Sequence, residues 1–234
     1  MERIPEPELM DEPGQVRAYA EADFEEPHRR FIEGFRGAFP RLAVVGRVLD
    51  LGCGPGDITR RFLEAYPACR VDALDGAANM LRWADRALTA AGVRERVRLI
   101  HARLPQTDLP ERAYDVVISN SLLHHLHDPA VLWQALRRHG RPGAAVYVVD
   151  LRRPASAAQA QALVAAHAGG EPPVLQRDFL HSLCAAFEPG EVRRQLAAAG
   201  LGSLRVAARG DRHLTVSGRL PAARPAWPGG PCVR

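Results

Sequence analysis

The chain contains no lysine, since all 31 of its basic residues are arginine. A Schiff-base lysine and the lysine of a phosphate-binding P-loop are therefore excluded. Cysteine is also scarce: four residues are scattered along the chain, and none forms a Cys-x-x-Cys pair. This usage predicts reduced thiols rather than disulfides or zinc ligands. No histidine–carboxylate cluster has the spacing of metal ligands, so we expect no bound metal.

Long hydrophobic runs are absent as well. No apolar stretch approaches the roughly 18–20 residues that span a bilayer, so we expect no membrane span. The first eight residues are acidic and interrupted by proline, unlike a secretory signal or a transit peptide. These absences predict a cytoplasmic protein. Its 234 residues, 47% of them hydrophobic, suffice for one α/β domain with a sizeable core.

The net charge of +4 raises the possibility of a nucleic-acid partner. The arginines are dispersed, however, and most lie on the solvated faces of predicted helices. A dedicated nucleic-acid surface would show clustered basic residues. We therefore expect no nucleic-acid partner.

Strand and helix patterns alternate between residues 47 and 150. Near-continuous apolar strands joined by helices are typical of a parallel, doubly wound sheet that is covered on both faces. Two late β runs on either side of a turn-rich stretch predict a C-terminal hairpin, which completes seven strands. The predicted strands are Arg47–Leu51, Arg70–Leu74, Val97–His101, Tyr114–Asn120, Ala144–Asp150, Leu204–Ala208 and His213–Ser217, and the helices among and after them are Asp57–Tyr66, Asn79–Ala91, Pro129–His139 and Gly190–Ala199.

We expect a single domain over residues 1–220 and a disordered tail over residues 221–234, which are rich in proline, glycine and alanine. Residues 1–46 should form a helical cap with helices over Gln15–Ala22 and His28–Phe39. An alanine-rich helical insertion, residues 152–187, should lie above the carboxyl ends of the strands, where open α/β sheets bind ligands. This position favours a substrate lid over a simple extra pair of helices.

The most informative segment follows the first predicted strand and reads Asp50-Leu51-Gly52-Cys53-Gly54-Pro55-Gly56-Asp57. Its glycines permit a tight turn and a close ligand, and the next helix begins with free N–H groups. The spacing differs from the Gly-x-Gly-x-x-Gly pattern of dinucleotide sites. A carboxylate at Asp50 would repel a pyrophosphate but attract an ammonium group. The segment therefore favours a cofactor that carries an amino-acid moiety.

Four segments in the expected order resemble the class I S-adenosylmethionine (SAM)-dependent methyltransferases, which have a Rossmann-like fold. The glycine segment resembles the family's motif I, which holds the methionine part of SAM. Residues 73–81 resemble its D-x-S-x-x-M-L segment, in which Asp75 would bind the ribose hydroxyls and Met80 would pack on the adenine. Residues 114–126 are similar to the L-H-H motif of the ubiquinone/menaquinone C-methyltransferase-like branch, and residues 141–144 match the turn before the fifth strand.

The resemblance covers residues 40–150 and implies SAM as the cofactor and S-adenosylhomocysteine as the product. Ala102 stands where the family has an acid that binds the adenine amino group, so backbone groups or a stacked Arg103 would replace that contact. The cofactor-binding residues that the resemblance implies are Asp50, Gly52, Cys53, Gly54, Gly56, Asp57, Asp75, Gly76, Met80, Ala102, Arg103, Leu104, Asn120, Ser121, Leu122 and His125.

Methyl transfer from a sulfonium requires mainly proximity and alignment, but some acceptors also need a base. His124 and His125 are the candidate catalytic residues, and at most one should face the acceptor because adjacent helical side chains diverge. Alternatively, one packs on the cofactor and the other contacts the next element. Candidate substrate-binding residues are Tyr19, Asp150, Asp178, Phe179 and Ser182. The alternatives are an N-cap for Asp178 and core packing for Tyr19 and Phe179.

The sequence thus predicts an enzyme that transfers the methyl group of SAM to a small-molecule acceptor. The predicted lid favours a small molecule, and the loop at residues 120–123 lacks the Asn-Pro-Pro-Tyr type of signature found in nucleic-acid amine methyltransferases. The alternatives are a tRNA or protein acceptor, or a non-methylating SAM enzyme or binding module of the same fold. Neither the acceptor atom nor the oligomeric state is indicated.

Overall fold

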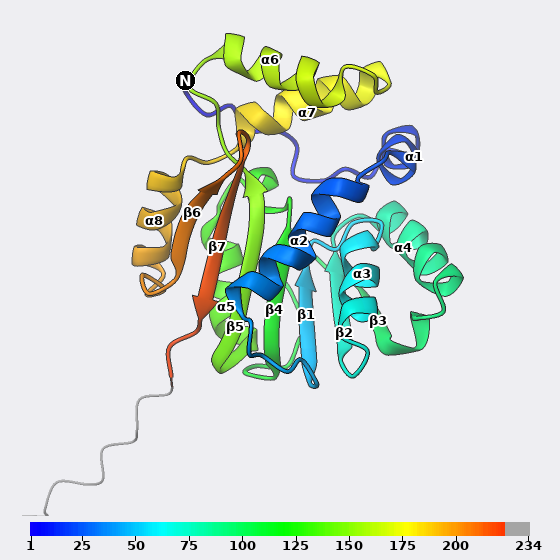
Figure 1. The fold of residues 1–234 in the computed structure, drawn as a ribbon, viewed down its shortest axis with the longest axis vertical. Coiled ribbons are helices and arrows are strands. Elements are labelled where there is room, and N and C mark those ends of the chain that lie inside the picture. Colours follow the sequence, from blue (N-terminus) through cyan, green and yellow to red (C-terminus); the bar gives the residue numbers. More distant parts are fainter. Residues whose placement is uncertain (223–234) are drawn as a thin grey trace, which may run out of the picture.

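The computed structural model describes residues 1–222, and Figure 1 shows their fold. Seven strands form one sheet in the order β3-β2-β1-β4-β5-β7-β6. Strand β7 runs antiparallel to both of its neighbours, whereas all other neighbouring strands are parallel. The predicted seven-stranded, mostly parallel α/β fold is therefore confirmed. The strands are β1 (Arg47–Leu51), β2 (Arg70–Asp75), β3 (Val97–His101), β4 (Tyr114–Asn120), β5 (Gly140–Leu151), β6 (Arg205–Arg209) and β7 (His213–Arg219).

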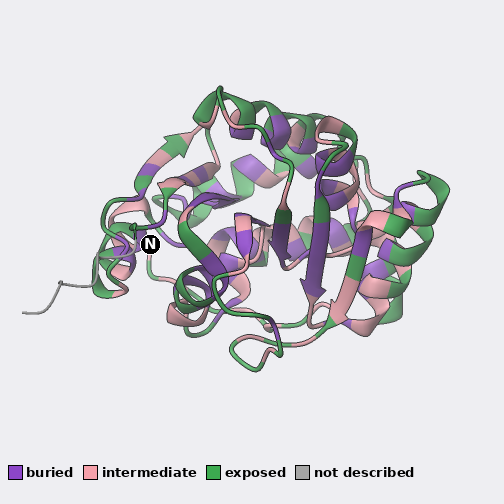
Figure 2. Ribbon diagram, turned by 90° about the horizontal axis from the view of Figure 1, so that it is seen from below, coloured by how far each residue is buried: buried purple, intermediate pink, exposed green. Residues whose placement is uncertain are grey.

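Helices cover both faces of the sheet, because alternate residues of the central strands point to opposite sides. Leu49 and Val117 belong to a buried cluster with α5 and α8, whereas Val48 and Val116 belong to a second one with α2, α3 and α4. Figure 2 shows the purple, buried strands between helices that are green on their outer sides. The helices are α1 (Pro13–Glu21), α2 (Glu25–Ala38), α3 (Asp57–Ala65), α4 (Ala78–Ala90), α5 (Ala130–His139), α6 (Ala157–Ala168), α7 (Pro173–Ala185) and α8 (Pro189–Ala198), with 3₁₀ turns η1 (Arg94–Arg96) and η2 (Leu123–His125).

Helices α6 and α7 occupy the predicted insertion and lie above the carboxyl ends of the parallel strands (Figure 1). Helix α6 contains no arginine, aspartate or glutamate, and His167 in its last turn is its one titratable residue. A small apolar cluster, in which Leu163 and Leu183 pack with Leu151 of β5, fixes the pair to the sheet. The insertion therefore covers the end of the sheet where the predicted site residues gather.

The amino-terminal region is only partly helical. Helices α1 and α2 form near their predicted positions, but residues 1–12 have no helix. Pro5 and Pro7 interrupt this segment, and its polar groups bond to distant elements instead. Strand β5 also begins four residues before its predicted start, because Gly140 pairs with Tyr114 across a register shift.

None of the helices within residues 1–222 has the length and apolar character needed to cross a membrane. Residues 221 and 222 follow β7 without regular structure. The rest of the predicted disordered tail, residues 223–234, lies outside the described residues.

Candidate functional site

The glycine loop joins β1 to α3 through left-handed backbone conformations, which residues other than glycine rarely adopt. Gly52, Gly54 and Gly56 have φ angles of 73°, 53° and 86°. The N–H groups of Gly52 and Cys53 both donate to the carbonyl of Leu74, at 2.8 and 3.0 Å, which ties the loop to the end of β2. A Cβ atom on Gly54 would meet nothing within 4 Å. The loop therefore exposes backbone to open space at Gly54.

Gly56 has a structural role that differs from the predicted one. It precedes α3 as the N-cap, and a Cβ atom there would lie 3.0 Å from the Cβ of Ala84 in α4. Gly56 does not line the cavity described below. Its assignment as a cofactor-binding residue is thus not supported by its position, because it allows α3 to pack closely against α4.

We predict that Gly56→Ala destabilises the fold more than Gly143→Ala. Both glycines have left-handed backbones, with φ of 86° and 80°, so both variants should lose about 1–2 kcal/mol from backbone strain. Only Gly56 adds a steric contact, since a Cβ atom at Gly143 meets nothing within 4 Å. Urea denaturation of the two variants measures the difference. Equal losses would show that α4 moves aside without cost.

Asp75 holds the glycine loop from the end of β2. Its carboxylate accepts hydrogen bonds from the N–H groups of Gly54 and Ala77, both at 2.8 Å. Burial raises the pKa of this carboxyl, and the two N–H donors partly offset the rise. A carboxylate has about four acceptor positions, so further positions remain for hydroxyl donors.

Asp50 is a buried carboxyl at the end of β1. It is 1% exposed and accepts a hydrogen bond from the Thr59 hydroxyl at 2.5 Å. Burial raises its pKa to about 7, which the Thr59 hydrogen bond opposes. No arginine or histidine within residues 1–222 forms an ion pair with it. The site therefore contains a buried acid that lacks a cationic partner.

Asp57 differs from Asp50 because its oxygens are already occupied. His28 lies 2.6 Å from one of them, and Arg60 and Arg61 donate to the group at 2.6 Å each. These partners hold the pKa of Asp57 well below its usual range despite the opposing effect of burial. Asp57 therefore links α2 to α3, and its carboxylate has less capacity for a cofactor than the sequence suggests.

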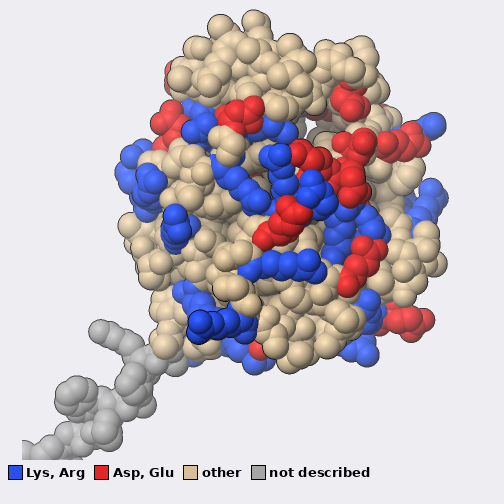
Figure 3. All heavy atoms as spheres, in the orientation of Figure 1, with Lys and Arg blue, Asp and Glu red and all other residues tan. Residues whose placement is uncertain are grey.

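One cavity of about 730 Å³ lies between the sheet and helices α6 and α7. Figure 3 shows a hollow below the largely tan surface of these helices, with basic and acidic side chains interleaved near it. All predicted site residues except Gly56 and Asp150 line the cavity. These are Tyr19, Asp50, Gly52, Cys53, Gly54, Asp57, Asp75, Gly76, Met80, Ala102, Arg103, Leu104, Asn120, Ser121, Leu122, His124, His125, Asp178, Phe179 and Ser182.

Asp150 does not face this cavity, although its position at the end of the fifth strand predicted a place in the acceptor pocket. It is 1% exposed, and its oxygens accept hydrogen bonds from the N–H groups of Leu123 and Leu151, each at 2.7 Å. Its Oδ1 also lies 2.6 Å from Nδ1 of His124. Asp150 therefore orients His124 and cannot itself reach an acceptor.

The two histidines of η2 have different environments. Asp150 raises the pKa of His124 against the opposing effect of burial. Burial and the neighbouring His124 lower the pKa of His125 to about 3, so this ring is neutral at physiological pH and a weak base. The ring centroids are 4.2 Å apart. Of the two predicted bases, His124 is therefore the one whose pKa is raised.

Glu6 is a site residue that sequence reasoning missed. Its Oε1 lies 3.2 Å from Nδ1 of His125 and 3.5 Å from Nε2 of His124, and the Ser182 hydroxyl donates to it at 3.1 Å. Burial raises the pKa of Glu6, opposed by His124 and Ser182. No local sequence pattern predicts a contact between residues more than 100 positions apart. The acidic, proline-rich first residues indicated only that they do not resemble a targeting signal.

The region predicted to hold the adenine also contacts the amino-terminal segment. Arg103 donates to Glu8 at 3.0 Å, and Ala102 donates its N–H to the carbonyl of Asp75 at 3.1 Å. Arg103 and Glu8 both line the cavity. Stacking of Arg103 on an adenine would therefore compete with an existing ion pair, which favours backbone contacts in this region.

Further parts of the cavity wall come from α1, α7 and the turn between β6 and β7. Burial raises the pKa of Tyr19 to about 12, so its hydroxyl stays neutral. Asp178 accepts a hydrogen bond from Gln15 at 2.7 Å, which joins α7 to α1. Phe179 packs with the apolar cluster under α6 and α7. Residues 209–213 at the hairpin turn also line the cavity, although no sequence pattern predicted a role for them.

Residues 48–144 match a family model described as "Methyltransferase domain". Among curated proteins, the chain is 38% identical over 96 residues to a trans-aconitate 2-methyltransferase of Azoarcus sp. (strain BH72), over 41% of this chain and 35% of that protein. It is 34% identical over 107 residues to an uncharacterized methyltransferase of Mycobacterium bovis, over 46% and 51%. The matches thus span about a third to a half of these relatives.

Solved structures of low sequence identity share the fold over most of the chain. A SAM-dependent methyltransferase of Aquifex aeolicus superposes with a TM-score of 0.64 at 18% identity, covering 90% of this chain and all of that one. A putative S-adenosylmethionine-dependent methyltransferase of Methanococcus maripaludis gives 0.69 at 14% identity, covering 94% and 98%. Residues 48–144 therefore match a methyltransferase domain, and the chain as a whole has the fold of these SAM-dependent methyltransferases.

Proposed function

We propose that this protein transfers the methyl group of SAM to a small organic acceptor bound beneath α6 and α7. The observation that carries this proposal is the buried, unpaired carboxyl of Asp50 beside the glycine loop. It suits the ammonium of an amino-acid cofactor, and Asp75 offers free acceptor positions for ribose hydroxyls. SAM supplies an activated methyl group on a sulfonium, and the chain's own residues bind and align the reactants.

The shape of the cavity supports a small acceptor. Its volume of about 730 Å³ lies within the range of about 300–1,000 Å³ found for ligand pockets. The predicted lid, α6 and α7, closes one side and would exclude water from the acceptor. Interleaved charges on the face in Figure 3 do not resemble a basic nucleic-acid surface. A cytoplasmic location stays a prediction from the sequence.

A small carboxylic acid is the first class of acceptor that we would test. Arg209 lines the cavity and donates to the Tyr147 hydroxyl and the Arg30 carbonyl, but it forms no ion pair with a carboxylate within residues 1–222. The name of the Azoarcus relative also indicates an organic acid as its acceptor. An arginine without an acidic partner suits an anionic group.

We predict that S-adenosylhomocysteine forms when the protein is mixed with SAM and the low-molecular-mass fraction of a bacterial extract. The acceptor should be enriched when that fraction is separated by anion exchange. Purified RNA and protein fractions should give no product above the no-acceptor background. Mass spectrometry of S-adenosylhomocysteine is the measurement, with Asp75→Asn as the inactive control. Product formation only with the RNA or protein fraction would contradict the proposal.

A further inference from the structure

The amino-terminal segment, residues 1–12, is held at several points against η2, the turn that contains His124 and His125 and is called the histidine turn below. The Ile4 N–H donates to the Cys184 carbonyl of α7 at 3.0 Å, and Arg3 donates to the carbonyls of His124 and Leu126, each at 3.0 Å. Farther along, Asp11 accepts the N–H of Asn79 at the start of α4 at 2.8 Å. These contacts on both sides fix the position of Glu6 between them.

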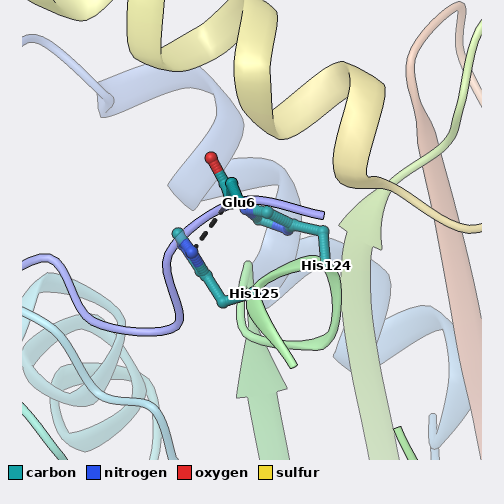
Figure 4. Close-up of side chains that lie close together, drawn as sticks. All are labelled: Glu6, His124 and His125. Carbon is teal, nitrogen blue, oxygen red and sulfur yellow. Dashed lines mark ion pairs between the residues drawn. The ribbon is translucent and has the colours of Figure 1, made fainter. Parts of the chain in front are cut away.

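Glu6 converges with the two histidines of η2 on one point, as Figure 4 shows. Oε1 of Glu6 is 3.2 Å from Nδ1 of His125 and 3.5 Å from Nε2 of His124, and all three groups offer a donor atom within 4.8 Å of the others. Ligands about 2.1 Å from one ion lie about 3.0–3.4 Å apart at octahedral to tetrahedral angles. The carboxylate–imidazole separations therefore match those around a bound metal ion.

His124 is oriented as a metal-bound histidine would be. Asp150 lies 2.6 Å from Nδ1, which leaves Nε2 to face Glu6. Metal-binding histidines typically donate their other ring N–H to a carboxylate or carbonyl, which fixes both the tautomer and the ring orientation. The Ser182 hydroxyl supports Glu6 in the same way, at 3.1 Å.

His125 presents a buried nitrogen that lacks a partner. Among the described residues, its Nδ1 has no hydrogen-bond partner despite being buried, because its approach to Glu6 does not have hydrogen-bond geometry. Buried polar nitrogens are nearly always satisfied by protein, water or an ion.

We propose that Glu6, His124 and His125 bind a divalent first-row transition ion, such as Zn²⁺ or Fe²⁺. Two imidazoles and one carboxylate suit these ions better than Mg²⁺ or Ca²⁺, which prefer oxygen ligands. Three protein ligands leave coordination positions open. Both histidines line the cavity, so the open positions lie within reach of a ligand bound there.

The ion would give the histidine turn a different role from that of a base. With Nε2 of His124 coordinated, the ring could not accept a proton from an acceptor. An acceptor oxygen bound to the ion would instead lose its proton more readily, because a divalent cation lowers the pKa of its ligands. Metal binding itself needs neither SAM nor an acceptor, because the three ligands are all side chains of this chain.

Metal binding can be measured without SAM. The full chain, carrying no polyhistidine tag, is stripped with a chelator and titrated with Zn²⁺ by calorimetry and with Co²⁺ by visible absorption. Wild type should bind one equivalent, and its Co²⁺ spectrum should lack the strong near-ultraviolet bands of thiolate ligands. Bound ion should also raise the melting temperature.

Glu6→Gln and His125→Asn should each weaken binding at least tenfold, whereas the matched control Glu8→Gln should bind as wild type does. Glu8 lies on the same segment but contacts Arg103 and the N–H of His127 instead. Melting curves of the metal-free proteins establish whether each variant is folded. If one of the two site variants does not fold, the other is sufficient for the test. Failure of the wild type to bind one equivalent, or unchanged affinity in both site variants, would overturn the proposal.

Discussion

Asp75→Asn is expected to weaken SAM binding by about 100-fold or more. The carboxylate of Asp75 organises the glycine loop through the N–H groups of Gly54 and Ala77, and its remaining acceptor positions suit the ribose hydroxyls. Each hydrogen bond to a charged group contributes about 1.5–3 kcal/mol, and about 1.4 kcal/mol corresponds to a tenfold change in affinity. An amide retains only one acceptor atom, so at least two such interactions are lost or weakened.

Calorimetric titration with SAM at pH 8 is the appropriate measurement for Asp75→Asn. Asp85→Asn is the matched control, because Asp85 is an exposed aspartate of α4 whose partner is Arg94. That variant should bind SAM as wild type does. An affinity within threefold of wild type in Asp75→Asn would refute the assigned role of Asp75, provided that the melting curve shows a folded protein.

SAM affinity is expected to fall by up to tenfold for each pH unit below about pH 7. Asp50 has a pKa of about 7 in the protein because it is buried, and its ionised form is the one that attracts an ammonium group. SAM binding must therefore displace a proton at lower pH. Dissociation constants measured between pH 5.5 and 8.5 test this expectation.

Two variants distinguish Asp50 from other titrating groups. Asp50→Asn should bind SAM weakly and without this pH dependence. Thr59→Val should shift the break in the profile upwards, because the Thr59 hydroxyl donates to Asp50 and lowers its pKa. A profile that keeps its break near pH 7 in Asp50→Asn would assign the dependence to another group.

The same carboxyl should also influence stability. Since the native state raises the pKa of Asp50 from 3.8 to about 7, the folded protein binds this proton more tightly than the unfolded chain does. The contribution of Asp50 to stability therefore decreases as pH rises from about 4 to 7 and is constant above that. Without SAM, Asp50→Asn should raise the melting temperature at pH 8 by more than at pH 5. An equal effect at both pH values would contradict the raised pKa.

Local patterns predicted most of the fold. The apolar runs from Arg47 to Asp150 form the five parallel strands within a few residues of their predicted bounds, because buried strands and amphipathic helices have distinct periodicities. The hairpin over residues 204–217 was equally local, since the turn-rich stretch separates its strands. The irregular start was not predicted, because residues 1–12 gain their order from contacts with α7, η2 and α4.

The residues of the candidate site were likewise predicted from the sequence only where a local pattern marks them. The sequence by itself determined the glycine loop, Asp50 and Asp75, because left-handed backbone and strand ends leave local signatures in glycine and acidic residues. Only the tertiary structure decided that Asp150 holds His124 instead of an acceptor, and that Glu6 joins both histidines. Those contacts bridge from 26 to about 120 residues, and packing alone brings such distant groups together.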